Sequence, residues 1–297
     1  MPRIRSWGPG LLLVSPSLIV LAVFVYGFIG WNIRVSFTSW RGLLPAYDNV
    51  GWRNYVALAG DQRFMQFDVP HIAIFTLVFV VGALAAGFFM ALLLDKGVRG
   101  ENFFRSVYLF PMAISFIATA IIWRWLMDNG EGASTTGLNK LLVGAGLGSL
   151  RSDWFRSDSK FAIAAIALPA GWALSGYVMS LFLAGMRGVP EELREAARVD
   201  GASEPKVFWY VVRPMLLPVL MSAVVILAHI SLKTFDLFYA MDQKNLKIDT
   251  PALYMWFTTF DGGFYARGAT IATLLLFGVA LVIVPYVWYS VRAERRK

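Results

Sequence analysis

The sequence has no cysteine and only two histidines, His71 and His229, among its 297 residues. The absence of cysteine excludes disulfides, thiolate metal sites and cysteine nucleophiles. Two histidines are too few to build a histidine metal centre, so we expect no metal site. Charged residues are also scarce, at 15% where soluble domains carry about 25%. Together with a hydrophobic content of 58%, this deficit indicates an integral membrane protein.

Six stretches are apolar for long enough to cross a bilayer, which takes about 20 residues. We therefore expect an all-α membrane protein with six transmembrane helices, which form a single domain over residues 1–297. The expected spans lie at about residues 11–33, 69–94, 106–126, 161–186, 214–232 and 268–291. Buried core helices are the alternative, which six such runs in one chain disfavour. The first run is too long for the core of a signal peptide and lacks a small-x-small cleavage site, so we expect it to be retained.

An even number of spans places both termini on the same side of the membrane. With the termini inside, the inner segments hold 14 of the 27 basic residues on much less chain than the outer loops. This higher density of basic residues inside agrees with the positive-inside rule. We therefore predict cytoplasmic termini in a multi-pass protein of a bacterial or archaeal plasma (inner) membrane. The net charge of +8 then reflects this bias and anionic lipid, and no nucleic-acid partner is expected.

The sequence limits how such a protein could be driven. A carrier coupled to protons or sodium normally keeps ionisable groups inside its spans, and these span interiors carry no carboxylate. No G-x-x-x-x-G-K-[ST] phosphate loop is present, so the chain does not bind ATP in that manner itself. We expect a transport subunit without an ATPase site, driven through a partner.

One charged stretch interrupts the apolar sequence, Glu191–Pro218. Acidic residues at its start suit the positive end of a helix dipole. Its small and apolar residues share one helical face, which would let another backbone approach closely. The members of that face are Leu193, Ala196, Ala197 and Asp200.

The same stretch predicts two helices with a turn between them. Glu191 with Arg194, and Glu195 with Arg198, are spaced to pair along the first helix. Gly201 should end that helix in a left-handed conformation, and a second helix should run from Ser203 to Pro214. A solvated surface helix is the alternative, but the Ala-Ala face and the glycine break favour docking.

This stretch resembles the EAA loop of ABC importer permeases, whose pattern is E-A-A-x-x-D-G-A followed by F, an aliphatic residue and two prolines. The matching residues are Glu195, Ala196, Ala197, Asp200, Gly201, Ala202, Phe208, Val212, Pro214 and Pro218. The resemblance implies a type I ABC importer permease fold, with residues 187–213 as the coupling loop between spans four and five. It further implies that the ATP-hydrolysing subunit is contacted by Glu195, Ala196, Ala197, Asp200, Gly201 and Ala202.

The family also implies the partners of this chain. These are a second permease, which forms a heterodimer with this one, two ATPase subunits that bind the ATP and Mg, and an extracytoplasmic sugar-binding protein. The chain itself then needs no cofactor.

Three further segments resemble the carbohydrate branch of the family. They are "GWRNYVALAGDQRF" (Gly51–Phe64), "RGENFFRSVYLFPMAIS" (Arg99–Ser115) and "GLN" (Gly137–Asn139). The amino-acid sequences of the first and third spans are most similar to those of permeases for glucose or mannose. One loop departs from the branch, because Met241–Pro251 is "MDQKNLKIDTP" where a T-G-G-G-P segment is usual. The resemblance implies that the solute is a neutral sugar, glucose or mannose, with a disaccharide or a glycerol-phosphate-like solute as the alternative.

A neutral sugar requires aromatic faces and hydroxyl partners within the path. The candidates are polar and aromatic residues of the spans, with Trp172 the best placed because it lies mid-span beside a glycine. They are Ser115, Thr119, Trp172, Ser175, Tyr177, Ser222 and His229. Serine and threonine in spans also bond neighbouring backbone. Two other classes stay open, an ion-coupled carrier or channel and a membrane-embedded enzyme, although the spans offer no catalytic carboxylate pair.

Overall fold

The computed structural model describes residues 8–130, 135–159 and 161–294. Every regular element in these ranges is helical, and the one β-bridge is an isolated pair, Thr38 with Asn49. The basic residues predicted at the two inner tails, Arg3, Arg5 and residues 295–297, lie outside the described ranges. Residues 131–134 and 160, between the third and fourth predicted spans, also lie outside them.

The contacts divide the chain into two compact units. Unit 1 comprises Met1–Asp61 and Tyr254–Leu276, and unit 2 comprises Gln62–Leu253 and Phe277–Lys297. Each unit is described by itself. The single domain expected from the sequence stays a prediction.

Unit 1 is built on the first apolar run. Helices α1 (Gly8–Leu21) and α2 (Phe28–Ser36) are joined by a π-helical turn and form one continuous rod. Asn32 fixes α2 to α15 (Tyr265–Glu294), because its side-chain amide donates to the carbonyl of Ala269 at 3.2 Å and to the hydroxyl of Thr273 at 3.1 Å. A polar residue inside an apolar run thus serves helix association.

The "GWRNY" segment has a structural task in unit 1. Asn54, in α3 (Arg53–Ala59), donates to the carbonyls of Ser36 and Thr38 at 2.8 and 2.9 Å. Tyr55 adds a hydroxyl contact with Ser36 at 2.6 Å. The two bonds from Asn54 satisfy the carbonyl of Ser36, the last residue of α2, and a carbonyl in the turn that follows it.

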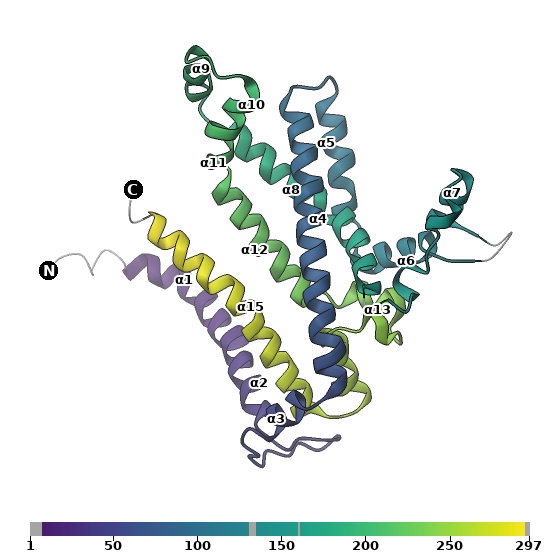
Figure 1. Ribbon diagram of the computed structural model, residues 1–297. Coiled ribbons are helices and arrows are strands. Elements are labelled where there is room, and N and C mark those ends of the chain that lie inside the picture. The colour runs from purple at the N-terminus through teal and green to yellow at the C-terminus, as the bar shows by residue number, and fades with distance from the viewer. Residues whose placement is uncertain (1–7, 131–134, 160, 295–297) are drawn as a thin grey trace. The chain divides into compact units, whose positions relative to one another are not determined.

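Unit 2 is arranged around α8 (Ala167–Arg187), the most buried of the long apolar helices, and α4 (Val69–Asp95) lies along it (Figure 1). The buried residues of α4 recur every three or four positions, so one stripe of the helix faces α8. The other elements of unit 2 are α5 (Glu101–Leu109), α6 (Phe116–Leu126), α7 (Gly137–Gly144), α9 (Glu191–Val199), α10 (Glu204–Val207), α11 (Arg213–Met215), α12 (Leu217–Lys233) and α13 (Asp236–Asp242). Helix α14 (Pro251–Trp256) begins in unit 2 and ends in unit 1.

Two glycines let the helices of unit 2 approach closely. A Cβ added to Gly87 of α4 would lie 2.6 Å from the Cβ of Val178 in α8. A Cβ added to Gly176 of α8 would overlap the carbonyl oxygen of Tyr108 in α5. Small residues at such interfaces gain van der Waals contact between backbones, which drives helix association in lipid.

The third predicted span is not one straight helix. Residues Glu101–Ala113 and Phe116–Leu126 form two helical pieces at 99° to each other. Ile114 and Ser115 between them are extended, with ψ near 134° and 150°. Pro111 lacks the N–H that a continuous helix would use, and Ser115 instead caps the new helix by accepting from the amide of Ala118 at 3.2 Å. The segment predicted as the span at about 106–126 is therefore bent at Ile114 and Ser115, and its crossing of the membrane as one span stays a prediction.

Four described helices are long and apolar enough to cross a membrane, and the number rises to six if each of two bent pairs is one span. The second bent pair joins Glu204–Met215 to Leu217–Lys233 at 59°, where the sequence predicts the entry into span five.

The "GLN" segment organises the loop that follows α6 in unit 2. Gly137 has φ near +55°, and a Cβ there would overlap the carbonyl oxygen of Leu126. Asn139 is fully buried and donates to the carbonyl of Ser152 at 2.9 Å, while its oxygen accepts from Trp154 Nε1 at 3.2 Å. This segment therefore holds a loop together.

Candidate functional site

The charged stretch forms the helix and turn that the sequence predicts. Helix α9 begins at Glu191, directly after Pro190, and ends at Val199. Gly201 has φ near +80°. The amide of Ala202 donates to the carbonyl of Ala197, and that of Gly201 to the carbonyl of Arg198, both at 2.9 Å. These two bonds form a Schellman motif, which needs a left-handed residue at Gly201.

One face of α9 lies on the surface of unit 2. Leu193 is 46% exposed and Val199 is 87% exposed, and Glu195, Ala196 and Asp200 are exposed beside them. The remaining predicted contact residues follow the same pattern, with Gly201 exposed and Ala197 and Ala202 half-buried. Apolar and small side chains exposed together on a short helix favour contact with another protein.

The ion pairs of α9 differ in part from those expected. Glu191 and Arg194 pair at 3.8 Å, as predicted. Arg198, however, is engaged by Glu204 at 2.7 Å and by Glu191 at 2.9 Å. Hydrogen bonds to these two carboxylates raise the pKa of the Arg198 guanidinium above its ordinary value, and the bond to Glu204 has the larger effect. The guanidinium thus braces α9 against the start of α10, and Glu195 stays available on the exposed face.

Several residues predicted for the solute path gather around α6 in unit 2. Thr119 is fully buried, and Trp123 lies one turn further on the same face. The ring of Trp123 packs edge-on against Trp172 of α8 at 6.1 Å between centroids. Thr119 Oγ1 and Trp123 Nε1 are both buried and make no hydrogen bond within the part of the chain that the structure describes. Buried polar atoms of this kind call for a partner.

A cavity of about 350 Å³ opens at the start of the same α6 face. Phe116 lines it from α6, one turn before Thr119, and His229 lines it from α12. Its other lining residues come from the end of α12 and the start of α13, and they are Ile230, Lys233, Thr234, Phe235 and Asp236. Lys233 Nζ lies 3.5 Å from His229 Nε2. Pockets of this size hold small ligands in other proteins.

The other predicted path residues lie elsewhere. Ser115 caps α6 and is exposed. Ser175 is buried and donates to the carbonyl of Trp172 at 3.4 Å. Tyr177 is half-buried. Ser222 donates to the carbonyl of Pro218 at 2.9 Å and shares a 2.7 Å hydrogen bond with the hydroxyl of Tyr286.

Sequence reasoning missed four of the residues that now stand with the candidates: Phe116, Trp123, Lys233 and Asp236. Trp123 was taken as part of an apolar run. The signal for Lys233 and Asp236 was present, because "KTFDLFY" (Lys233–Tyr239) mixes charge with aromatic rings directly after a span. Only the fold shows that Phe116 faces the same cavity.

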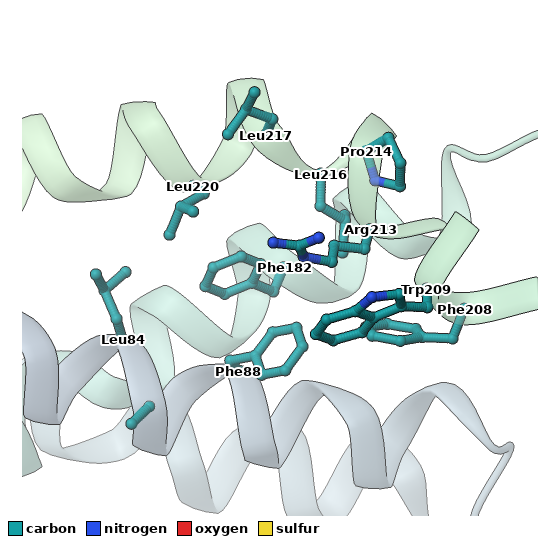
Figure 2. A pocket seen from close by; sticks show the side chains of 11 residues that line it. Leu84, Phe88, Phe182, Phe208, Trp209, Arg213, Pro214, Leu216, Leu217 and Leu220 are labelled. Atoms are coloured by element: carbon teal, nitrogen blue, oxygen red, sulfur yellow. The ribbon is translucent and has the colours of Figure 1, made fainter. Parts of the chain in front are cut away.

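A second and larger cavity, of about 510 Å³, lies where α11 and α12 meet α4 and α8 (Figure 2). Leu84, Phe88, Phe182 and Leu220 line it with apolar side chains. Its one charged group is Arg213, whose guanidinium lies over the ring of Trp209 at 4.4 Å. This lining offers few polar partners for a solute with many hydroxyl groups.

The surface helix with its Gly201 turn and the apolar bundle behind it agree with what a comparison with known families finds. Residues 83–296 match the family described as the binding-protein-dependent transport system inner membrane component. The chain belongs to this family. The predicted membership of the ABC importer permeases is thereby confirmed.

Related permeases match almost the whole chain. This permease is 39% identical to a probable ABC transporter permease protein of Pyrococcus horikoshii, over 96% of this chain and 97% of that protein. It is 35% identical to the xylose/arabinose import permease protein XacH of Haloferax volcanii, over 92% of this chain and 84% of that protein. It is 27% identical to the glucose import system permease protein GlcT of Saccharolobus solfataricus, over 97% and 98% of the two chains.

A solved structure confirms the fold. A chain of the bacterial alginate ABC transporter in complex with alginate pentasaccharide-bound periplasmic protein superposes with a TM-score of 0.78, at 17% identity, over 98% of this chain and 96% of that one. At that identity the likeness concerns the fold alone. The permease has the all-α, type I ABC importer fold that the sequence predicts.

Proposed function

We propose that this permease is a membrane subunit of an ATP-driven sugar importer and forms half of the path for a neutral sugar. The main support for the proposal is one face of α6. It begins at the cavity that His229 also lines, continues past the buried polar atoms of Thr119 and Trp123, and packs there against the ring of Trp172. The names of two relatives, a xylose/arabinose and a glucose permease, support a sugar as the solute.

The chemistry of the cavity suits a neutral sugar. Phe116 and Phe235 provide rings for the C–H surface of a pyranose. Asp236 can accept from hydroxyls, and Lys233 and His229 can donate to them. The cavity has one fixed cation and one fixed anion, so it gives an ionic solute no net attraction. We propose glucose or mannose.

The free energy enters through α9. We propose that its exposed face, with Glu195, Ala196 and Asp200, docks on one of two ATPase subunits, which bind the ATP and Mg. A second, related permease would supply the other half of the path, and an extracytoplasmic binding protein would deliver the sugar. In this arrangement α9 faces the cytoplasm, and so do both termini.

Uptake of labelled sugars into membrane vesicles that contain the full complex tests the proposal. We expect ATP-dependent uptake of glucose or mannose, and little uptake of glycerol phosphate. A clear preference for glycerol phosphate would contradict a neutral solute, and a preference for maltose would contradict only the monosaccharide. Equal uptake in ATP-depleted vesicles would instead support an ion-coupled carrier.

A further inference from the structure

The C-terminal ends of α4 and α8 and the start of α5 lie beside α9, where two arginines connect them. We call these helix ends the inner ends of unit 2. Arg187, the last residue of α8, forms a two-pronged ion pair with Glu101 at the start of α5, with both contacts at 2.8 Å. Its guanidinium also reaches the carbonyl of Leu94 near the end of α4, at 3.4 Å. Helices α4, α5 and α8 are therefore linked at this end before α9 begins.

Arg194 makes the corresponding link from α9. It points away from the exposed face, and its side chain is 17% exposed. The guanidinium donates to the carbonyl of Met186 in the last turn of α8 at 2.6 Å, and it lies 3.7 Å from the carboxylate of Asp95 at the end of α4. A third contact, with Glu191 at 3.8 Å, stays within α9.

The connection between α8 and α9 explains why this link matters. Only Gly188, Val189 and Pro190 separate the two helices, and a glycine next to a helix end permits rotation about the backbone. Without a side-chain link, α9 could pivot on this short segment. Arg194 crosses it, because its bond partner Met186 precedes the segment and Arg194 itself follows it. The Met186 carbonyl, in the last turn of α8, accepts from the amide of Val189 at 3.3 Å as well as from Arg194, and a cation suits that end of the helix dipole.

We propose that Arg194 is the positioning residue that passes movement of α9 to the inner ends of α4 and α8. This inference rests on the proposed docking of α9 on an ATPase subunit. The docking face would move with the ATPase, and the guanidinium on the opposite side of α9 would convert that movement into displacement of the two spans. Planar guanidinium geometry suits the task, since it reaches a carbonyl and a carboxylate at once.

Substitutions at both ends of the link test it in the full complex, reconstituted with its ATPase subunits and sugar-loaded binding protein. The readout is the ratio of stimulated to basal ATP hydrolysis, measured beside subunit assembly and thermal stability. We expect R194A to assemble and hydrolyse ATP at the basal rate, with stimulation reduced about tenfold, as expected for the loss of a hydrogen bond to a charged group. R194K should recover part of the stimulation, because an ammonium can reach the Met186 carbonyl alone.

Asp95 provides a second variant in case R194A does not assemble. D95N removes the charge on α4 and leaves the Met186 bond, so its stimulation should lie between those of the wild type and R194A. The double variant should be no worse than R194A, because both changes break one link. R198A is the matched control, since Arg198 sits on the same helix but pairs only within the α9–α10 segment among the contacts described.

The outcomes separate this inference from the proposed function. Normal stimulation in both R194A and D95N would overturn the role of Arg194 and leave the coupling role of α9 intact. An equal loss in R198A would also overturn it, because any charge removal on α9 would then suffice. If the wild-type complex shows no stimulation by sugar-loaded binding protein, the proposed function itself fails.

Discussion

At the residue scale, Thr119 and Trp123 each have one buried polar atom that matters for the candidate solute site. Their polar atoms are buried without a hydrogen bond in the described part of the chain, and leaving such a group unsatisfied costs about 1–3 kcal/mol. A sugar hydroxyl would offset part of that cost. The α6 face is thus poised to hold a polar solute more tightly than an apolar one.

The hydroxyl of Thr119 can be removed with almost no change in volume. We expect T119V to raise the KM for sugar uptake about threefold to tenfold, because a net hydrogen bond contributes about 0.5–1.5 kcal/mol. T76V is the matched control, since the hydroxyl of Thr76 is already bonded to Ser231 at 2.9 Å. An unchanged KM in T119V, with uptake measured across sugar concentrations, would remove Thr119 from the path.

Gly201 allows a second prediction at this scale. No described atom of the permease lies within 4 Å of a Cβ added there, so within the permease the harm from G201V would come from backbone conformation. A β-branched residue resists φ near +80°, and the left-handed conformation costs an ordinary residue about 1–2 kcal/mol. We expect G201V to lose sugar-stimulated ATP hydrolysis and G201N to retain much of it, because asparagine tolerates this region. Similar activity in the two variants would contradict the argument.

Glu195 is the third residue to test. Its carboxylate is exposed on the proposed docking face, and a charge-assisted contact there would be worth about 1.5–3 kcal/mol. We expect E195A to reach the membrane and to lose sugar-stimulated ATP hydrolysis. Wild-type stimulation in this variant would argue against Glu195 as a contact.

At the scale of elements, unit 2 depends on how closely α8 approaches its neighbours. Gly176 has no room for a side chain, because the Tyr108 carbonyl of α5 occupies the place of a Cβ. Gly87 makes the same allowance between α4 and α8. The bend after α5 and the path along α6 both depend on this packing, since α5 leads directly into them.

Alanine at Gly176 tests that packing. We expect G176A to lower the stability of the purified permease by about 1–3 kcal/mol, the usual cost of overpacking, and to lower its thermal midpoint in detergent. G82A is the control, because a Cβ at Gly82 in α4 meets nothing within 4 Å. Equal midpoints for G176A and the wild type would show that α5 and α8 can separate at little cost.

At the scale of the whole molecule, the fold fits one half of a larger path. The permease has an exposed face on α9, and Thr119 and Trp123 lie on one face of α6, next to the cavity that Phe116 lines. A closed path needs a second surface opposite. We therefore predict a heterodimer with a related permease.

Co-purification from native membranes followed by mass spectrometry of the bound subunits measures this directly. The expected result is one copy of this chain with one copy of a different permease and two ATPase subunits. A stable complex that transports sugar with two copies of this chain would contradict the heterodimer. G201V is the control for the co-purification, because this variant should still bind the second permease even where it loses stimulated ATP hydrolysis.

The sequence alone determined the helical membrane class, the family, the position of the charged surface helix α9 and the left-handed turn at Gly201. These follow from local properties, namely apolar runs, capping residues and a motif within one short stretch, and local interactions depend little on the rest of the chain. The tertiary structure alone decided the bend at Ile114–Ser115 and the cavity that Phe116 and His229 both line. It also decided the link from Arg194 to Met186 and Asp95. Hydropathy treats the third span as one run, because it registers polarity and not the interruption of hydrogen bonds at Pro111. Arg194 pairs with Glu191 as its spacing predicts, but its contacts with α4 and α8 depend on where those helices end, and sequence spacing carries no information about that.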